Sequence, residues 1–427
     1  MPDLTLTIDP VEAARRLAST AAELAPAAER DRQLAEPHRA STPLELLYDL
    51  TIVVAFGTAA NELAHFVAED HVSAGVFGFV FACFAVTWAW LNYSWFASAY
   101  DTDDWVFRLA TFVQMAGVIV LTLGLAPMFE SLDHGGTVDN GVMVAGYVVM
   151  RVPLLFLWWQ VSLHDPPRRR TARTYLAFVG VAQAGWVALA IVGLDVGPTL
   201  VALVFLVALE MAGPRVAESK GGTPWHPHHI AERYGLLVII TLGEVILGAV
   251  ASVEAVVNGE AGWSLDAALL LVAGVGLAFG CWWMYFSVPW AEPLVRHRER
   301  SWVFGYGHLF GYAALAAMGA GLHVAAIALD GKAEIGAVAI VLSAALPFAI
   351  YTAVFYALYS LLIHTRDPFH LGLLAGTAVL IALSVGLAAA GASVAVSLLV
   401  LALAPAVTVV GYETVGHRHM SDALQRL

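Results

Sequence analysis

Four ionisable side chains lie in one otherwise apolar stretch, HIAERYGLLVIITLGEVILG at 229–248. His229, Glu232 and Arg233 stand at positions i, i+3 and i+4, so in a helix they share a face near its first turn. Glu244 comes about 18 Å beyond Glu232 along a helix that rises about 1.5 Å per residue. A carboxylate that deep in a membrane costs about 2.5 to 3.5 kcal/mol on insertion scales. Glu244 must therefore face a partner, a cavity or other helices, or be protonated.

A second pair of acids, Glu45 and Asp49, stands one helical turn apart just behind Pro43. Two carboxylates this close perturb each other's protonation, as a proton or cation site requires. A proline is also typical of the first helical position, and the helix dipole favours acids in the first turn. For Asp49, a proton or cation site and a helix-terminus acid are equally favoured. For Glu45, the helix-terminus interpretation is favoured.

Arg151 lies in the middle of another apolar run, two residues before Pro153, where no residue of its own helix neutralises it. Glu244 is expected at a comparable depth, so the sequence predicts an Arg151–Glu244 pair between helices. Such a pair can take part in function or can simply fix helix packing. His308 is a weaker polar candidate, since it could merely hydrogen-bond a neighbouring helix.

Acids and histidines also gather near the expected cytoplasmic edge: Asp101, Asp103, Asp104, His226, His228 and His229. Imidazole and carboxylate groups are common metal ligands, which makes the three histidines weak metal candidates. Their spacing matches no closed metal site, so no metal and no cofactor are predicted. The acids lie opposite Arg108 and are interpreted as a loop staple and a helix cap.

The composition indicates that a membrane surrounds these residues. The chain of 427 residues is 59% hydrophobic and 13% charged, with a mean hydropathy of +0.75. These values are too apolar for a soluble protein and indicate an integral membrane protein in contact with the lipid bilayer. Cys83 and Cys281 lie in apolar runs, which excludes a disulfide framework and a cysteine-based zinc site. The net charge of −13 argues against nucleic acid as a partner.

After Pro43 the chain consists of apolar runs of membrane-spanning length, separated by short polar breaks. We expect an all-α polytopic protein of about twelve transmembrane helices over 44–66, 72–98, 106–128, 139–163, 173–194, 197–213, 230–254, 265–289, 302–326, 336–363, 370–389 and 392–412. The least secure run is 197–213, because it is short and contains Glu210. The expected division is a cytoplasmic polar tail (1–40), a first six-helix half (41–213), a cytoplasmic connector (214–229), a second six-helix half (230–414) and a cytoplasmic C-terminal tail (415–427).

The basic residues indicate how these spans are oriented. If the N-terminus is cytoplasmic, all but two of the 21 Lys and Arg residues fall on the cytoplasmic side, and the exceptions are Lys332 and Arg151. This asymmetry matches the positive-inside rule. Both termini are therefore expected in the cytoplasm, with the multi-pass chain in the inner (plasma) membrane.

Three motifs of the first half recur in the same order in the second half, at offsets of 186, 192 and 197 residues. The pairs are YDLTIVVAFG (48–57) with YGLLVIITLG (234–243), Trp90-x-x-Tyr93 with Trp282-x-x-Tyr285, and Trp105-Val106-Phe107 with Trp302-Val303-Phe304. Because each half has an even number of spans, the repeat predicts halves of parallel topology. Binding sites in such folds lie between the halves near the midplane of the membrane.

Five motifs extend over most of the chain: TPLELLYDL (42–50), YDTDDWVFR (100–108), HIAERYGLLVIITLGE (229–244), WWMYF (282–286) and GYGHL (305–309). Together they resemble the bacterial low temperature requirement A family. The resemblance implies a polytopic membrane protein, named for a role in growth in the cold, and assigns no chemistry to the motif positions. The positions that carry over are Glu45, Asp49, Asp101, Asp103, Asp104, Arg108, His229, Glu232, Arg233, Gly243, Glu244 and His308.

Two functional classes fit these features. Twelve spans, parallel halves and acids at several depths favour a secondary transporter of a small solute or ion, with proton coupling through candidates among Glu45, Asp49, Arg151, Glu232, Arg233, Glu244 and His308. The alternative is a membrane maintenance factor or a membrane-embedded enzyme acting on lipid or envelope components. No nucleophile–base pair, phosphate loop or zinc signature supports an enzyme. A purely structural role is a third possibility.

Overall fold

The computed structural model describes residues 39–257, 264–363 and 368–420, and for 252–257 the backbone alone. Most of the tail expected over 1–40, and the end of the tail expected over 415–427, lie outside these ranges. Within them the regular elements are helices, apart from one isolated bridge between Thr137 and Asp195.

The helices, in chain order, are α2 (Pro43–Ala68), α3 (Val72–Tyr100), α4 (Trp105–Leu123), α5 (Leu125–His134), α6 (Gly141–His164), η1 (Pro166–Arg168), α7 (Arg169–Val192), α8 (Val196–Glu218), α9 (Pro227–Val257), α10 (Leu265–Phe286), α11 (Ala291–Arg296), η2 (Arg298–Arg300), α12 (Ser301–Leu329), α13 (Ala337–Ile363), α14 (Pro368–Ala389), α15 (Val394–Leu401), α16 (Ala404–Gly411) and η3 (Tyr412–Gly416).

In the described ranges, 12 helical segments are long and apolar enough to cross a membrane. The predicted number of spans and the all-α class are therefore confirmed. The least secure run, 197–213, is longer in the structure, where it forms α8. The third span is interrupted at Gly124, between α4 and α5, and the connection from α8 to α9 comprises residues 219–226.

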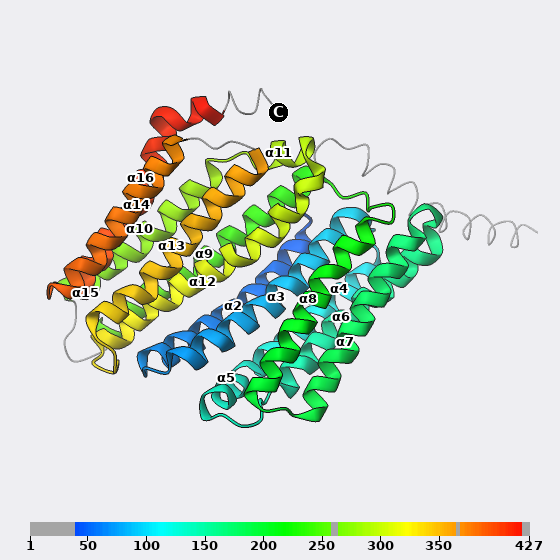
Figure 1. Cartoon of the computed structure of the whole chain (residues 1–427), viewed down its shortest axis with the longest axis horizontal. Helices are drawn as coiled ribbons and strands as arrows, with labels where there is room; N and C mark the ends of the chain where they lie inside the picture. Colours follow the sequence, from blue (N-terminus) through cyan, green and yellow to red (C-terminus); the bar gives the residue numbers. More distant parts are fainter. Residues whose placement is uncertain (1–38, 258–263, 364–367, 421–427) are drawn as a thin grey trace, which may run out of the picture.

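The helices form two groups that lie side by side (Figure 1). One group contains α2 to α8 and the other contains α9 to α16. In each group the first span packs on the second and third, the third on the fourth, the fourth on the fifth, and the fifth on the sixth. This shared order of neighbours supports a six-plus-six repeat, and the repeat itself stays a prediction.

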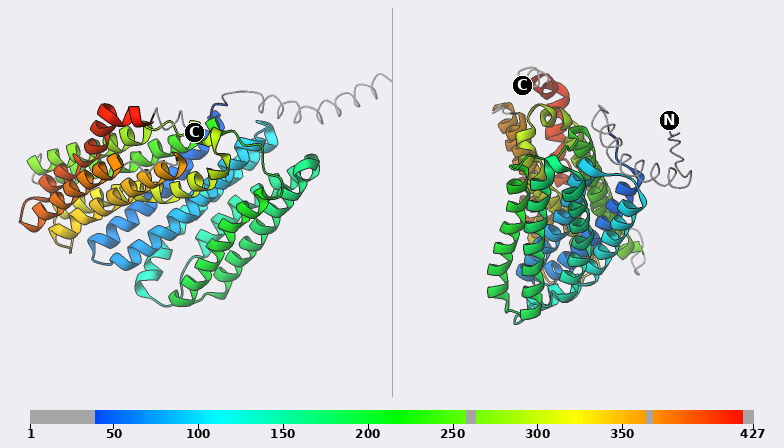
Figure 2. Two further views of the ribbon diagram at one scale, coloured as in Figure 1. Left: turned by 45° about the horizontal axis from the view of Figure 1, so that its top comes forward. Right: turned by 90° about the vertical axis from the view of Figure 1, so that its right-hand side faces the viewer.

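We call the end of the bundle at which α2 and α9 begin the amino face, and the other end the opposite face. The right-hand view of Figure 2 shows the long helices running between these two ends. The two groups meet where α2 and α3 pack against α9 and α12. α2 and α9 run in the same direction, because two successive contacts, Glu45 with His229 and Asp49 with Arg233, both join residues 184 positions apart.

Residues at the start of α2 explain why the helix begins at this point. Thr42 is the N-cap and Pro43 occupies the first turn. The backbone amide of Thr42 donates to Oε2 of Glu45 at 2.8 Å, and the amide of Glu45 donates to Oγ1 of Thr42 at 3.3 Å. This reciprocal capping box fixes the first turn, so Glu45 and Asp49 both face α9.

Further from the amino face, two glycines bring α9 and α12 together. A Cβ atom on Gly248 would lie 2.3 Å from the carbonyl oxygen of Gly319, so this crossing requires glycine. One turn earlier on α9, the Glu244 carboxylate points toward α2, where a Cβ atom on Gly57 would lie 3.0 Å from both carboxylate oxygens. The close crossing therefore holds Glu244 at the junction of the two groups.

Candidate functional site

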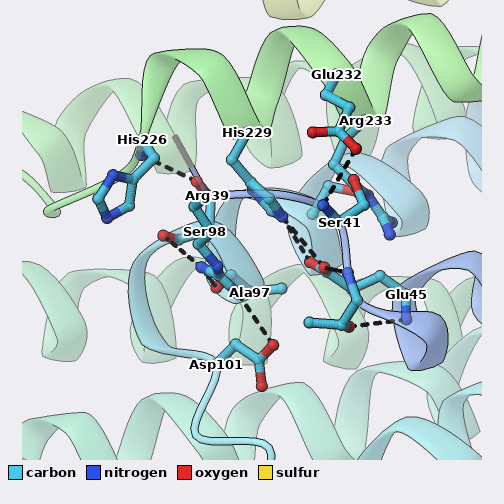
Figure 3. A network of polar contacts seen from close by, with 12 residues as sticks. Arg39, Ser41, Glu45, Ala97, Ser98, Asp101, His226, His229, Glu232 and Arg233 are labelled. Atoms are coloured by element: carbon cyan, nitrogen blue, oxygen red, sulfur yellow. Dashed lines mark hydrogen bonds and ion pairs between the residues drawn. The ribbon is translucent and has the colours of Figure 1, made fainter. Parts of the chain in front are cut away.

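At the start of α2, a network of polar side chains joins the two groups of helices (Figure 3). Nε2 of His229 lies 3.1 Å from Oε1 and 3.2 Å from Oε2 of Glu45, and neither side chain is exposed. The same Glu45 carboxylate closes the capping box with Thr42. Glu45 is thus a helix-terminus acid, as the sequence favours, and it also links α2 to α9.

Arg39, just before α2, ties this network to the end of α3. Its guanidinium donates to the carbonyl oxygens of Ala97 and Ser98 at 2.7 and 2.9 Å, and pairs with Asp101 at 3.0 Å. Burial, helped by the Glu45 carboxylate and opposed by Arg39, raises the pKa of Asp101 to about 6. Nothing in the sequence distinguishes Arg39 from the other arginines of the expected tail.

One turn deeper, Asp49 and Arg233 form a second pair between the groups. Oδ1 of Asp49 lies 2.8 Å from Nη2 of Arg233, and both side chains are 0% exposed. Nε1 of Trp90 donates to the same Oδ1 at 2.7 Å, and Arg233 also donates to the hydroxyl of Ser94 at 3.1 Å. Each of the two acids of α2 therefore faces its own partner on α9.

The Asp49–Arg233 pair is incompletely satisfied. Among the described residues, Oδ2 of Asp49 and both Nε and Nη1 of Arg233 have no hydrogen-bond partner. Buried polar atoms are normally hydrogen-bonded, and ionisable residues inside a membrane are candidates for function by default. These atoms keep Asp49 and Arg233 among the candidate functional residues.

The predicted pair of Arg151 with Glu244 is wrong. Nη2 of Arg151, on α6, lies 3.2 Å from Oε2 of Glu210, on α8, and both side chains are almost fully buried. Arg151 also donates to the hydroxyl of Tyr147. This pair lies inside the first group of helices, whereas Glu244 stands on α9, so similar depth along the helices did not identify the partner.

Glu210 is held by donors from three neighbouring helices. It accepts hydrogen bonds from Trp88 at 2.6 Å, Tyr147 at 3.0 Å, Trp186 at 3.2 Å and Gln183 at 3.4 Å. Hydrogen bonds to an ionised acceptor are strong in a buried network. Glu210 is therefore a packing centre of the first group, whereas from the sequence it was only a reason to doubt the span that contains it.

Glu244 lies in a groove of about 430 Å³ between α2, α9 and α12. Gly57, Thr58, Asn61 and His323 also line this groove. The residue is only 8% exposed, yet within the described part of the chain its carboxylate has no hydrogen-bond or ion-pair partner. The Glu244 carboxylate is therefore in direct contact with whatever occupies the groove.

The groove continues to the opposite face. A second cavity of about 290 Å³ also includes His323 and extends to Lys332, beyond the end of α12. Nδ1 of His323 lies 3.1 Å from Oδ1 of Asn61, and the rings of His65 and His323 are 5.7 Å apart. The two cavities share Ala251 and His323, so the groove extends from Glu244 toward the opposite face, whereas the ion pairs of the amino face lie at the other end of the junction.

Comparison with known proteins places the chain in a family. The model of the bacterial low temperature requirement A protein (LtrA) family matches residues 40–405, which contain all the motif positions given above. The chain belongs to the bacterial low temperature requirement A family. An uncharacterized protein of Rhizobium meliloti (strain 1021) is 28% identical to this low temperature requirement A protein over 292 residues, 64% of this chain and 66% of the relative. The match thus spans slightly less than two thirds of the relative's length, and no solved structure matches the chain.

Two of the predicted candidates have ordinary structural contacts in this low temperature requirement A protein. Glu232 is exposed and accepts a hydrogen bond from the backbone amide of Ser41 at 3.2 Å. His308 is buried, with Nδ1 2.7 Å from the carbonyl oxygen of Phe304 and Nε2 2.9 Å from the hydroxyl of Tyr285. A carbonyl oxygen only accepts, so Nδ1 carries the proton and Nε2 accepts from the tyrosine. Both ring nitrogens of His308 are satisfied by the fold.

The histidines that were weak metal candidates do not converge. His229 contacts Glu45, whereas the backbone amide of His226 donates to the hydroxyl of Ser98 at 3.0 Å. Burial and the positive charge of Arg39 lower the pKa of His226 to about 4, so its ring is neutral near pH 7. Among the residues that the structure describes, no group of three or more His, Cys, Asp and Glu side chains is placed to hold a metal ion.

The acidic loop before α4 has the structural roles predicted for it. Oδ1 of Asp104 accepts from the backbone amides of Val106 and Phe107 at 2.9 and 2.8 Å, which caps α4. Asp103 pairs with Arg108 at 2.9 Å, and both side chains are more than half exposed. The staple and the cap are confirmed.

Proposed function

We propose that this protein is a proton-coupled secondary transporter of a small solute, in which Glu244 carries the proton. The observation that supports the proposal most strongly is the position of the Glu244 carboxylate. It stands between the two groups of helices without a partner among the described residues, in a largely apolar groove whose lining also includes Thr58, Asn61 and His323. Transporters built from repeated halves bind their substrates and coupling ions at such a junction.

We place the amino face in the cytoplasm and the groove on the outer side of the membrane. The basis for this orientation is the excess of Lys and Arg on the amino side of the spans. Both termini are then cytoplasmic. A membrane-impermeant thiol reagent added outside should label a cysteine introduced at Gly136, in the loop after α5, and should miss one at Arg169, at the start of α7. The reverse labelling would overturn the orientation.

The two ion pairs between α2 and α9 act as the cytoplasmic gate in this proposal. Glu45–His229 and Asp49–Arg233 join the first spans of the two halves in successive layers. Opening toward the cytoplasm requires both contacts to separate, and closing the groove requires the helices to enclose Glu244. A charged carboxylate is costly to enclose, so the closing step needs either a proton or a cationic solute on Glu244.

Transport in reconstituted vesicles tests the proposal. Purified protein is reconstituted into liposomes that contain a pH-sensitive dye. A panel of small solutes is then added under an imposed pH gradient, and we expect one class of solute to be transported together with protons. Glu244→Gln should fold and insert normally and lose this coupled flux. Glu232→Gln is the matched control, because Glu232 lies on the same helix but is exposed and accepts a hydrogen bond from the backbone amide of Ser41. The control should retain the flux.

One outcome would replace the proposal. If the protein moves no solute and no proton under any gradient while still supporting growth in the cold, the transport proposal fails. The membrane maintenance factor acting on lipid or envelope components then becomes the better account. An unchanged coupled flux in Glu244→Gln would instead refute the assignment of the proton to Glu244.

A further inference from the structure

A separate cavity of about 140 Å³ lies between the two groups of helices at the amino face. Its walls come from α3, α6, α7 and α8 of the first group, from the connection at Trp225, and from η2 and α12 of the second group. An apolar protein cavity of about 150 Å³ holds a molecule the size of benzene. The cavity therefore fits a compact organic molecule, and both groups of helices contact what it contains.

Aromatic residues make up six of the thirteen that line the cavity. The six aromatic residues are Trp95, Trp158, Tyr175, Trp225, Trp302 and Tyr306. They hold one another in place: Trp158 stacks on Tyr175 with ring centroids 4.1 Å apart, and Trp95 meets Trp225 edge to face at 4.8 Å. Aromatic faces attract organic cations, most strongly in a site with little water.

Glu218, near the end of α8, supplies a negative charge to the cavity. Its carboxylate is fixed by three hydrogen bonds: from the hydroxyl of Tyr175 at 2.8 Å, and from the backbone amide and hydroxyl of Thr223 at 2.8 and 3.0 Å. A fixed carboxylate beside aromatic faces is complementary to an ammonium group.

Arg298 supplies a positive charge at the mouth of the cavity. It lines both the cavity and the surface depression outside Trp225, so it stands between them. Its guanidinium carbon lies 4.1 Å from the centre of the Trp225 ring, and Nη2 donates to the carbonyl oxygen of Trp225 at 2.8 Å. These contacts leave further guanidinium donors to bind an anionic group.

We propose that this cavity binds a small zwitterion. Its ammonium group lies among the aromatic rings beside Glu218, and its anionic group faces Arg298. Free solutes of the betaine type and the headgroup of a zwitterionic phospholipid share this chemistry. The inference concerns binding alone, so it holds or fails independently of transport.

Calorimetric titration of the full chain in phosphatidylglycerol nanodiscs tests the proposal. The probes are glycine betaine, choline, which lacks the anionic group, and 3,3-dimethylbutan-1-ol, the uncharged analogue of choline. We expect saturable binding of glycine betaine, at least tenfold weaker binding of choline and no binding of the alcohol. Glu218→Gln and Trp302→Leu should each weaken binding of glycine betaine at least tenfold. Trp105→Leu is the matched control, because Trp105 is 75% exposed and lies outside the cavity.

Three results would overturn the proposal: no saturable binding of glycine betaine to the wild-type chain, equal binding of the uncharged alcohol, or unchanged binding in folded Glu218→Gln and Trp302→Leu variants. A further comparison identifies the source of the zwitterion. Binding of a short-chain phosphatidylcholine at least tenfold tighter than glycerophosphocholine would assign the cavity to a lipid headgroup. Equal or weaker binding of the lipid would assign it to a free solute.

Discussion

Asp49 and Arg233 lie 2.8 Å apart at the junction of the two groups of helices, and neither side chain is exposed. Their contact joins the first span of one group to the first span of the other, one turn below the contact of Glu45 with His229. A bilayer core offers no water to replace a lost partner. The amino face therefore depends on two layers of paired side chains to stay closed.

Removing one charge of the deeper layer should destabilise the protein. Asp49→Asn leaves the Arg233 guanidinium buried without its counter-ion, which costs about 3 to 5 kcal/mol for a broken buried pair. Asp103→Asn is the control, because the Asp103–Arg108 pair is exposed and its loss should destabilise the protein far less. Unfolding in detergent micelles by denaturant measures both. Similar losses in the two variants would show that Asp49 and Arg233 are not a buried pair.

A double-mutant cycle should confirm the partner of Arg151. Arg151→Met and Glu210→Gln remove the two sides of one contact, so their effects on the free energy of unfolding should deviate from additivity by about 0.5 to 3 kcal/mol. Arg151→Met and Glu244→Gln act on separate groups of helices and should add within about 0.5 kcal/mol. Coupling between Arg151 and Glu244 with additivity between Arg151 and Glu210 would contradict the observed pairing.

Asp101 should make stability depend on pH in a defined direction. Its pKa is about 6 in the folded protein, against about 3.9 in an unfolded chain, so between these values the folded state binds a proton that the unfolded state lacks. This contribution to stability is present below the unfolded value and is lost as the pH rises through about 6.

Asp101→Asn removes that contribution. Between pH 7.5 and pH 4.5, the wild-type protein should gain on the order of 2 kcal/mol of unfolding free energy relative to the variant. Denaturant titrations of both proteins at the two pH values measure the difference. Parallel pH dependence in the two proteins would show that Asp101 titrates as an exposed acid does.

Two glycines offer a matched test of the space around Glu244. Gly57→Ala places a methyl group 3.0 Å from both carboxylate oxygens of Glu244, so the carboxylate has to move and coupled flux should fall several-fold. Gly243→Ala adds the same group next to Glu244 in sequence, where, apart from its chain neighbours and the adjacent helix backbone, no described atom lies within 4 Å of it. The control should keep its flux and gain about 0.5 to 1 kcal/mol of stability from helix propensity. Equal flux in both variants would argue against a tight fit at Gly57.

Periodicity and charge distribution predicted the membrane class and the spans well, because hydropathy over about 20 residues is a strong signal. They also selected His229, Arg233, Glu45 and Asp49, since ionisable residues are rare inside apolar helices. They could not predict which ionisable side chains pair with one another. Hydrophobic runs show which residues are inside a span and at what depth, but not which helix a side chain faces.

Arg151 shows this limit most clearly. Glu210 and Glu244 both lie deep in apolar helices, and only the arrangement of helices decides that α8 rather than α9 packs near Arg151. Trp88 and Trp90 illustrate the same limit: tryptophans in spans are often interfacial, yet both are 0% exposed and donate to buried carboxylates. The sequence did not identify Arg39 as part of the network for a different reason: by composition this residue belongs to the polar tail expected over 1–40.

Glu244 is the residue on which the transport proposal depends, and its protonation can be measured directly. A hydrophobic carbodiimide reacts with protonated carboxyl groups in apolar surroundings, and mass spectrometry of digested protein locates the adduct. In nanodiscs between pH 5 and pH 9, we predict an adduct at Glu244 that declines as the pH rises, is absent in Glu244→Gln and abolishes coupled flux in vesicles. An unmodified Glu244 at every pH, or full flux in protein modified at Glu244, would contradict the proposal.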